Sequence, residues 1–113
     1  MIFAGFDIGG TKCAAVIANA ENDEIKILKR YEYKTQGTWQ QITDTFCEKL
    51  KELSENIVSL DEIKACGVSC GSPLNGRKGI IMSPPNLPGW DNVAICDYIK
   101  KKTGIDTYLF NDA

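Results

Sequence analysis

The chain has 113 residues, of which 43% are hydrophobic, and 13 basic against 15 acidic side chains give a net charge of −2. A chain of this length can bury one hydrophobic core, so we expect a single domain. It lacks the basic block typical of nucleic-acid-binding proteins and has no apolar run near the roughly 20 residues of a membrane span, which excludes nucleic acid and membrane as expected partners.

The cysteines also limit the class of protein. There are five of them, an odd number, with no Cys-x-x-Cys pair and no histidine anywhere in the chain. We therefore expect no zinc site within this chain and no disulfide framework. The amino terminus lacks the cationic region of a signal peptide, and Asp7 interrupts its apolar run. These features predict a cytoplasmic location with reduced, mostly buried thiols.

Two apolar runs, over residues 2–6 and 13–18, lie on either side of a Gly-Gly pair. Runs of this kind predict two strands joined by a tight hairpin turn. We expect Gly9 and Gly10 to supply the positive φ angles that such a turn needs. Because glycine has no Cβ, the same pair would also let a ligand approach the main chain closely.

The residues around this turn have the chemistry of a phosphate site. Backbone N–H groups at Gly9 and Gly10 could hold phosphate oxygens, and Thr11 and Lys12 add a hydroxyl and a cation. Asp7, at the carboxyl end of the first strand, could hold Mg²⁺ directly or through water. An ordinary hairpin with a solvated Asp7 is the structural alternative.

The next two elements are a strand and a helix. A polar turn with its corner at Asn22-Asp23 precedes a run whose alternate residues are apolar, which predicts a third strand with one solvated face (Ile25, Ile27, Tyr31 and Tyr33). The three strands would form an antiparallel meander. Thr38 and Gln41 have the spacing of a capping box, and an apolar stripe follows at helical spacing, over about five turns (Trp39, Ile42, Phe46, Leu50, Leu53 and Ile57). We interpret this stripe as core packing.

The segments after this helix alternate between strand and loop. The small apolar run at 63–70 predicts a strand covered on both faces, and the right-handed crossover rule makes it parallel to the first strand. Residues 71–76 form a loop at its carboxyl end, residues 80–82 a short extended piece, and residues 83–90 a proline-rich loop of the restricted kind that binding sites use.

A second helix and a fifth strand complete the chain. Asp91 or Asn92 would cap the helix, Gly104 suits its C′ position, and Lys100–Lys102 would complement the dipole of its last turn. The run at 107–110 predicts a strand that is again parallel. The order is therefore βββαβαβ, an α/β fold with a mixed five-stranded sheet.

Polar groups gather at one edge of this predicted sheet. In an open sheet with parallel strands, ligands bind beyond the carboxyl ends of those strands. Asp7 with its glycines, Gly71-Ser72 and Asn111-Asp112 all fall at that edge, and the Asn86 loop could fold over it. Since scattered solvated residues would have no reason to collect there, the pattern predicts a functional site.

With these pieces in place, the chain resembles the amino-terminal lobe of the ROK family of bacterial sugar kinases and sugar-responsive repressors. The run Asp7–Lys12 looks like the first phosphate motif, Asn86–Trp90 resembles the sugar-binding loop, and Asn111–Ala113 looks like the start of the catalytic motif. The resemblance implies a ribonuclease H-like fold of the actin-like ATPase superfamily, with ATP and Mg²⁺ as cofactors.

The resemblance also implies roles for individual residues. Asp112 would be the general base that accepts a proton from a sugar hydroxyl, with Asn86 and Asn111 binding sugar hydroxyls. Asp7 would help to place Mg²⁺, and Gly9, Gly10, Thr11 and Lys12 would lie near the phosphates. The structural alternatives are a strand-end cap for Asp112, a turn residue for Asn86 and a packing wedge for Trp90.

The chain departs from the family pattern in two respects. Ser72 replaces a glycine in the run Gly67–Asn75, which adds a hydroxyl near the sugar and leaves the identity of the sugar open. The family's carboxy-terminal lobe, with the adenosine pocket, is absent from residues 1–113. We therefore expect weak sugar binding and negligible turnover from this chain alone. The resemblance implies that the intact parent is a kinase and that it could form a homodimer.

Two other functions stay open. The chain could be the sensor lobe of a ROK-type transcriptional regulator, but such proteins carry a DNA-binding segment before the phosphate motif, here already at Asp7, and need not keep a base such as Asp112. It could also have a structural role through self-association of its exposed hinge face. Both Asp7 and Asp112 favour the kinase.

Overall fold

The computed structural model describes residues 1–112, so Ala113 of the predicted catalytic motif lies outside the described residues. Its elements are β1 (Ile2–Ile8), β2 (Lys12–Glu21), β3 (Glu24–Lys34), α1 (Trp39–Ser54), the 3₁₀ turn η1 (Leu60–Glu62), β4 (Cys66–Cys70), β5 (Leu74–Asn75), β6 (Ile80–Ile81), α2 (Ile95–Thr103) and β7 (Thr107–Asn111). The predicted order βββαβαβ is confirmed. The small β5–β6 hairpin is an addition, and it takes up part of what was predicted to be a loop over residues 71–76.

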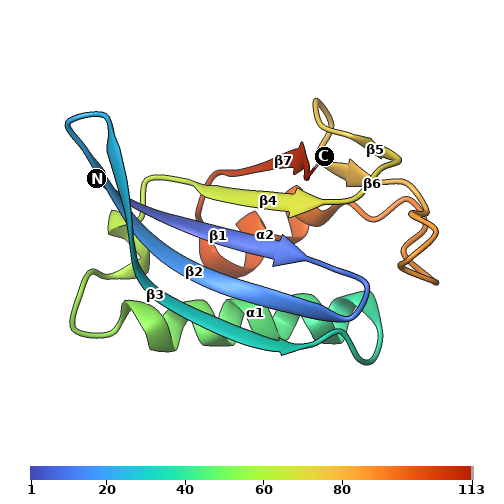
Figure 1. The fold of residues 1–113 in the computed structure, drawn as a ribbon, viewed down its shortest axis with the longest axis horizontal. Coiled ribbons are helices and arrows are strands. Elements are labelled where there is room, and N and C mark those ends of the chain that lie inside the picture. Colours follow the sequence, from blue (N-terminus) through green and yellow to red (C-terminus); the bar gives the residue numbers. More distant parts are fainter. Residues whose placement is uncertain (113) are drawn as a thin grey trace.

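The main sheet has five strands in the order β3-β2-β1-β4-β7. β1, β2 and β3 form the predicted antiparallel meander, whereas β4 is parallel to β1 and β7 is parallel to β4. Figure 1 shows the arrowheads of β1, β4 and β7 pointing to the same side of the molecule, where the β1–β2 turn and the β5–β6 hairpin also lie. The sheet is therefore mixed, and its three parallel strands share one carboxyl edge.

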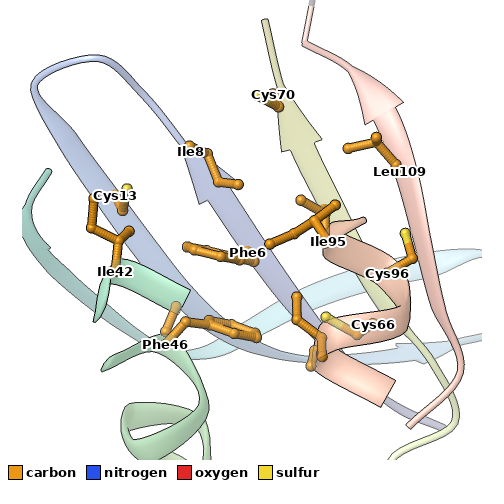
Figure 2. Close-up of a cluster of buried hydrophobic side chains, with 14 of the residues drawn as sticks. Phe6, Ile8, Cys13, Ile42, Phe46, Cys66, Cys70, Ile95, Cys96 and Leu109 are labelled. Carbon is orange, nitrogen blue, oxygen red and sulfur yellow. The ribbon is translucent and has the colours of Figure 1, made fainter. Parts of the chain in front are cut away.

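Both helices pack against the same face of the sheet. Phe6 of β1 stacks on Phe46 of α1 with ring centroids 4.2 Å apart and an interplanar angle of 6°. Figure 2 shows this pair among side chains from α2 and the neighbouring strands, including Ile95 and Leu109. The opposite face, to which Gly5 and its alternate neighbours in β1 project, is not covered by either helix; we call it the helix-free face.

The third strand differs from its prediction because of a β-bulge. Where the register shifts, adjacent residues of β2, Ile17 and Ala18, pair with Lys29 and Ile27, so Leu28 is an extra residue. Adjacent residues of a strand point to opposite faces, and an extra residue reverses the alternation. The four apolar residues predicted to share one face therefore divide between two, with Tyr31 and Tyr33 on the helix face and Ile25 and Ile27 on the helix-free face.

β4 is covered on one face only, so the prediction that this strand is covered on both faces is wrong. Its residues alternate between buried and half-buried, with Cys66, Val68 and Cys70 buried and Gly67 and Ser69 half-buried. The half-buried residues lie on the helix-free face, where no helix packs. The strand also begins at Cys66, three residues later than the predicted Ile63.

The first helix begins as predicted and the second does not. Thr38 Oγ1 accepts a hydrogen bond from the Gln41 amide at 3.2 Å, and the Thr38 amide donates to Gln41 Oε1 at 2.9 Å, so the capping box is confirmed. In α2 the N-cap is Ala94, without a side-chain cap. The predicted cap Asp91 instead accepts a hydrogen bond from Ser83 Oγ at 2.5 Å, which holds the preceding loop.

The ends of the helices follow simple rules. Gly104 ends α2 in the left-handed conformation with φ 78°, as predicted, and three lysines lie in the last turn. α1 ends at Ser54, so Ile57 packs beside the core from outside the helix.

All five cysteines, which lie within the described residues, are free thiols, and four of them are buried. Neither helix of the described residues is long and apolar enough to cross a membrane.

Candidate functional site

The β1–β2 turn has a different conformation from the predicted one. Among the glycines of the described residues, positive φ occurs at Gly37, Gly79, Gly89 and Gly104, so Gly9 and Gly10 do not use it and that prediction is wrong. The reason for glycine here is lack of space. A Cβ on Gly9 would lie 2.7 Å from the Lys12 carbonyl oxygen, and one on Gly10 would lie 2.9 Å from the Asn86 carbonyl oxygen.

The turn presents free backbone donors. Its hairpin is closed by one hydrogen bond, from the Gly9 amide to the Lys12 carbonyl at 3.1 Å. Within residues 1–112, no hydrogen bond is formed by the amide N–H of Gly10 or of Thr11. Two successive free N–H groups at an exposed turn are suitable partners for an anion such as phosphate.

Lys12, the cation predicted for this site, already has a carboxylate near it. Its ammonium group lies 3.7 Å from Glu32 Oε2 on β3, and both side chains are largely exposed. Arg30 and then Lys12 lower the pKa of Glu32. Exposed ion pairs of this kind are weak. A phosphate could therefore compete for Lys12, but it would have to displace Glu32 or share the ammonium group with it.

The proline-rich loop is anchored by two buried side chains that follow Asn86. Leu87 and Trp90 are each 2% exposed, whereas Asn86 is exposed. Backbone hydrogen bonds close the loop, from the Ser83 amide to the Trp90 carbonyl at 2.9 Å and from the Leu87 amide to the Pro84 carbonyl at 3.0 Å. Trp90 is thus a packing wedge, as the structural alternative proposed, and it holds the loop in place.

The Asn86 side chain lies between two of the predicted site segments. Its Nδ2 would be 3.2 Å from a Cβ on Gly10, in the β1–β2 turn, and its Oδ1 would be 3.8 Å from a Cβ on Gly71, just beyond β4. These three segments are far apart in the sequence. The structure therefore brings the phosphate-type turn, the end of β4 and the proline-rich loop together, as predicted for the carboxyl edge.

The end of β7 joins this edge through the backbone. Asn111 pairs with Cys70 in the parallel register, and the Asp112 amide donates to the Cys70 carbonyl at 3.0 Å. Burial and, after it, the Asp112 carboxylate raise the pKa of the Cys70 thiol, the Gly71 backbone lowers it and Asp7 adds a smaller increase, so that the pKa is about 11. The two predicted carboxylates therefore act on one buried thiol at the end of β4.

Asp7 and Ser72 are placed less closely than the other predicted residues. Asp7 is exposed, pairs with Ser69 and projects to the helix-free face, where it lines a shallow trough of about 240 Å³. Ser72 is exposed, and in the described part of the chain its hydroxyl forms no hydrogen bond. Both lie at the carboxyl edge, yet within residues 1–112 neither forms a hydrogen bond with Asn86.

Sequence reasoning missed two residues at this edge. Cys70 was treated only as a buried thiol, although it lies next to Asp112. Thr35 has no place among the predicted site residues, yet its hydroxyl and amide donate hydrogen bonds to two carbonyls of the β1–β2 turn. The one usable signal for Thr35 was its place directly after the third strand, where an antiparallel meander brings it opposite the first turn.

Comparisons with known proteins agree with this geometry. The model of the ROK family matches residues 3–113. The glucokinase of Thermotoga maritima is 27% identical over 109 residues, which cover 96% of this chain and 33% of that protein. The crystal structure of a ROK family glucokinase from Streptomyces griseus, in complex with glucose and AMPPNP, has a TM-score of 0.83 at 26% identity and covers all of this chain and 34% of that one.

A regulator has the same fold. The structure of a ROK family transcriptional regulator, homologous to the MLC protein of E. coli, has a TM-score of 0.74 at 14% identity, over 98% of this chain and 28% of that one. The mixed sheet with two helices is thus the ribonuclease H-like fold of actin-like ATPases. This chain spans about a third of the length of the curated relative described above.

Proposed function

The chain belongs to the ROK family, and we propose that it is the amino-terminal lobe of a longer protein that transfers a phosphoryl group from ATP to a hydroxyl of a hexose or N-acetylhexosamine. The observation that carries this proposal is the position of Asn86 between Gly10 and Gly71. It puts a loop resembling the family's sugar-binding loop against a turn with free amide donors, so a sugar and a phosphate chain could meet there.

In this proposal Asp112 is the general base. It lies one residue beyond β7, is exposed, and is held through its amide by the Cys70 carbonyl. Its carboxylate would accept the proton of the attacking sugar hydroxyl, whose oxygen forms the new bond to phosphorus while ADP leaves. General-base assistance is commonly worth about 10²–10⁴ in rate.

Asn86, Asn111 and Ser72 would bind the sugar. An amide side chain both donates and accepts hydrogen bonds, so it suits a sugar hydroxyl in either role. The buried Leu87 and Trp90, which follow Asn86, anchor the loop, and this would position the backbone that carries the Asn86 amide before the sugar arrives. Such positioning accounts for much of the catalysis in phosphoryl transfer.

The β1–β2 turn would hold the phosphates. The Gly10 and Thr11 amides are free donors within the described residues, and both residues are exposed, so a ligand could reach them. Bound ATP supplies the phosphoryl group, with Mg²⁺ offsetting its charge. Within residues 1–112, no three acidic, Cys or His side chains gather as a metal site, so Asp7 would hold Mg²⁺ with water and phosphate oxygens.

This chain alone would be half of the site. The relatives named above are about three times as long, and the adenosine pocket of the family belongs to the other lobe. We expect weak sugar binding and negligible turnover from the 113-residue chain, and a cytoplasmic location for the parent. Hexose phosphorylation by this chain at a normal kinase rate would contradict that expectation.

The second candidate is a sugar sensor, favoured by the shared fold of the ROK regulator. A sensor needs the sugar-binding residues but not the base. The two functions therefore differ in the expected effect of Asp112, which is essential for a kinase and dispensable for binding.

The test is a sugar panel on the longer protein, with Mg-ATP present and ADP release as the readout. We expect turnover on one hexose, and a loss of about 10²–10⁴ in Asp112→Asn. Asp106→Asn is the matched control, because Asp106 lies just before β7 in an exposed ion pair with Lys100, so turnover should stay unchanged. Sugar binding without ADP release would contradict the kinase function and support the sensor function.

A further inference from the structure

Thr35 forms hydrogen bonds with the β1–β2 turn from the end of β3. It follows the last residue of β3 and is half-buried. Its hydroxyl donates to the Gly9 carbonyl at 2.7 Å, and its amide donates to the Thr11 carbonyl at 2.9 Å. Its hydroxyl oxygen also lies 3.2 Å from Cys13 Sγ. One residue thus binds two alternate carbonyls of the turn.

These bonds fix the direction of the amide groups. A peptide unit is planar and trans, so its C=O and N–H point in opposite directions. The Gly9 carbonyl and the Gly10 N–H belong to one peptide unit. Since the carbonyl points to the Thr35 hydroxyl, the Gly10 N–H points away from Thr35, and it is free within the described residues.

We propose that Thr35 is a positioning residue for phosphate binding. It holds the Gly9 carbonyl so that the Gly10 amide faces the ligand. The proposal rests on the proposed function of the turn as a phosphate site. Thr35 itself lies on the opposite side of the peptide and does not contact the phosphate. Its effect is on nucleotide affinity, because a turn free to rotate its Gly9–Gly10 peptide would present the donor only part of the time.

A purely structural role for Thr35 makes a different prediction. If the hydroxyl only stabilised the hairpin, its loss would lower the free energy of unfolding and leave the affinity of the folded protein for nucleotide unchanged. The proposal instead expects a change in affinity that is specific to nucleotide and that returns with the hydroxyl.

The experiment is a titration of the ¹⁵N-labelled 113-residue chain with Mg-ATP, followed through the Gly10 and Thr11 amide signals. Thr35→Val removes the hydroxyl at constant shape, Thr35→Ser keeps it, and Thr35→Ala avoids any steric clash if the valine variant fails to fold. Thr45→Val is the matched control, since the Thr45 hydroxyl donates to the Gln41 carbonyl within α1.

We expect the valine and alanine variants to bind Mg-ATP about 3- to 10-fold more weakly, the range that one hydrogen bond supplies. The serine and Thr45→Val variants should bind as the wild type does. Wild-type affinity in Thr35→Val, or equal losses in Thr35→Ser and Thr35→Val, would overturn the role of Thr35 alone. If Mg-ATP shifts neither amide in the wild-type chain, the phosphate role of the turn fails first.

Discussion

The two hairpin turns of the meander differ in backbone conformation and in the reason for their residue types. At the β2–β3 turn, Asn22 and Asp23 take positive φ values of 51° and 64°, although neither is glycine. At the β1–β2 turn, Gly9 and Gly10 do not use positive φ, yet a Cβ on either would come within 3 Å of a backbone oxygen. Asn22 and Asp23 provide the conformation of their own turn. Gly9 makes room for a carbonyl of its own turn, and Gly10 makes room for a distant loop.

Glycine can therefore occur in a turn for two separate reasons, a positive φ or a lack of space for a Cβ. A left-handed turn can be made by Asn and Asp, whose short polar side chains tolerate that conformation. An approach as close as that of the Asn86 carbonyl to Gly10, by contrast, leaves no room for a Cβ. Gly10 is therefore required by Asn86, which is 76 positions beyond it in the chain, whereas Gly9 is required by the Lys12 carbonyl of its own turn.

The largest effect is expected from Gly10→Ala. Its Cβ would lie 2.9 Å from the Asn86 carbonyl oxygen and 3.1 Å from the Asn86 Cβ, so the loop must move. Overpacking of this kind costs about 1–3 kcal/mol of the free energy of unfolding, measurable by urea denaturation. The Asn86 and Trp90 amide signals should shift as well.

Gly71→Ala is the matched control for that prediction. A Cβ at Gly71 would make an ordinary contact, 3.8 Å from Asn86 Oδ1. We expect a loss of less than about 0.5 kcal/mol, as for substitutions that disturb no packing. Equal losses in the two alanine variants would show that the crowding at Gly10 is not what fixes the loop.

A smaller effect is expected at the other turn. Asn22→Ala places an ordinary residue at φ 51°, which should cost about 1–2 kcal/mol of the free energy of unfolding. Asn22→Gly should restore most of that loss, since glycine adopts the conformation freely. Neither variant should change the signals of Gly10 or Asn86, and a change there would contradict the separation of the two turns.

The smallest effect is expected from Glu32→Gln, which removes the carboxylate 3.7 Å from the Lys12 ammonium group. With Lys12 no longer paired, Mg-ATP should bind slightly more tightly, by about twofold or less, as exposed ion pairs are weak. Arg30 and then Lys12 hold the pKa of Glu32 below its usual value. The difference between variant and wild type should therefore vanish only as the pH falls below that lowered pKa. Weaker binding by the variant at neutral pH would contradict this prediction.

Local signals in the sequence predicted the local structure well. The order of elements along the chain, the Thr38–Gln41 capping box, the Gly104 C-cap and the corner at Asn22-Asp23 are all confirmed, because each depends on residues within a few positions of one another. The ROK resemblance was also confirmed, since it rests on motifs that can be read directly.

The errors came from contacts between distant segments. The bulge at Leu28 responds to pairing with β2, and the cap predicted at Asp91 is bound instead by Ser83 from the proline-rich loop. The contacts of Gly10 with Asn86 and of Thr35 with Gly9 join segments that no periodicity links. Candidate site residues could thus be proposed from the sequence, but not the contacts that position them.

The most direct test of the proposed binding site is an amide-shift map of the 113-residue chain. The chain is titrated separately with a panel of hexoses and with Mg-ATP. We predict that one sugar shifts the side-chain amides of Asn86 and Asn111 and the amide of Ser72, while Mg-ATP shifts Gly10 and Thr11. Shifts confined to the separate hollow between the helices, lined by Asp44, Cys47 and Lys102 among others, would contradict the claim that the carboxyl edge of the sheet is the binding site.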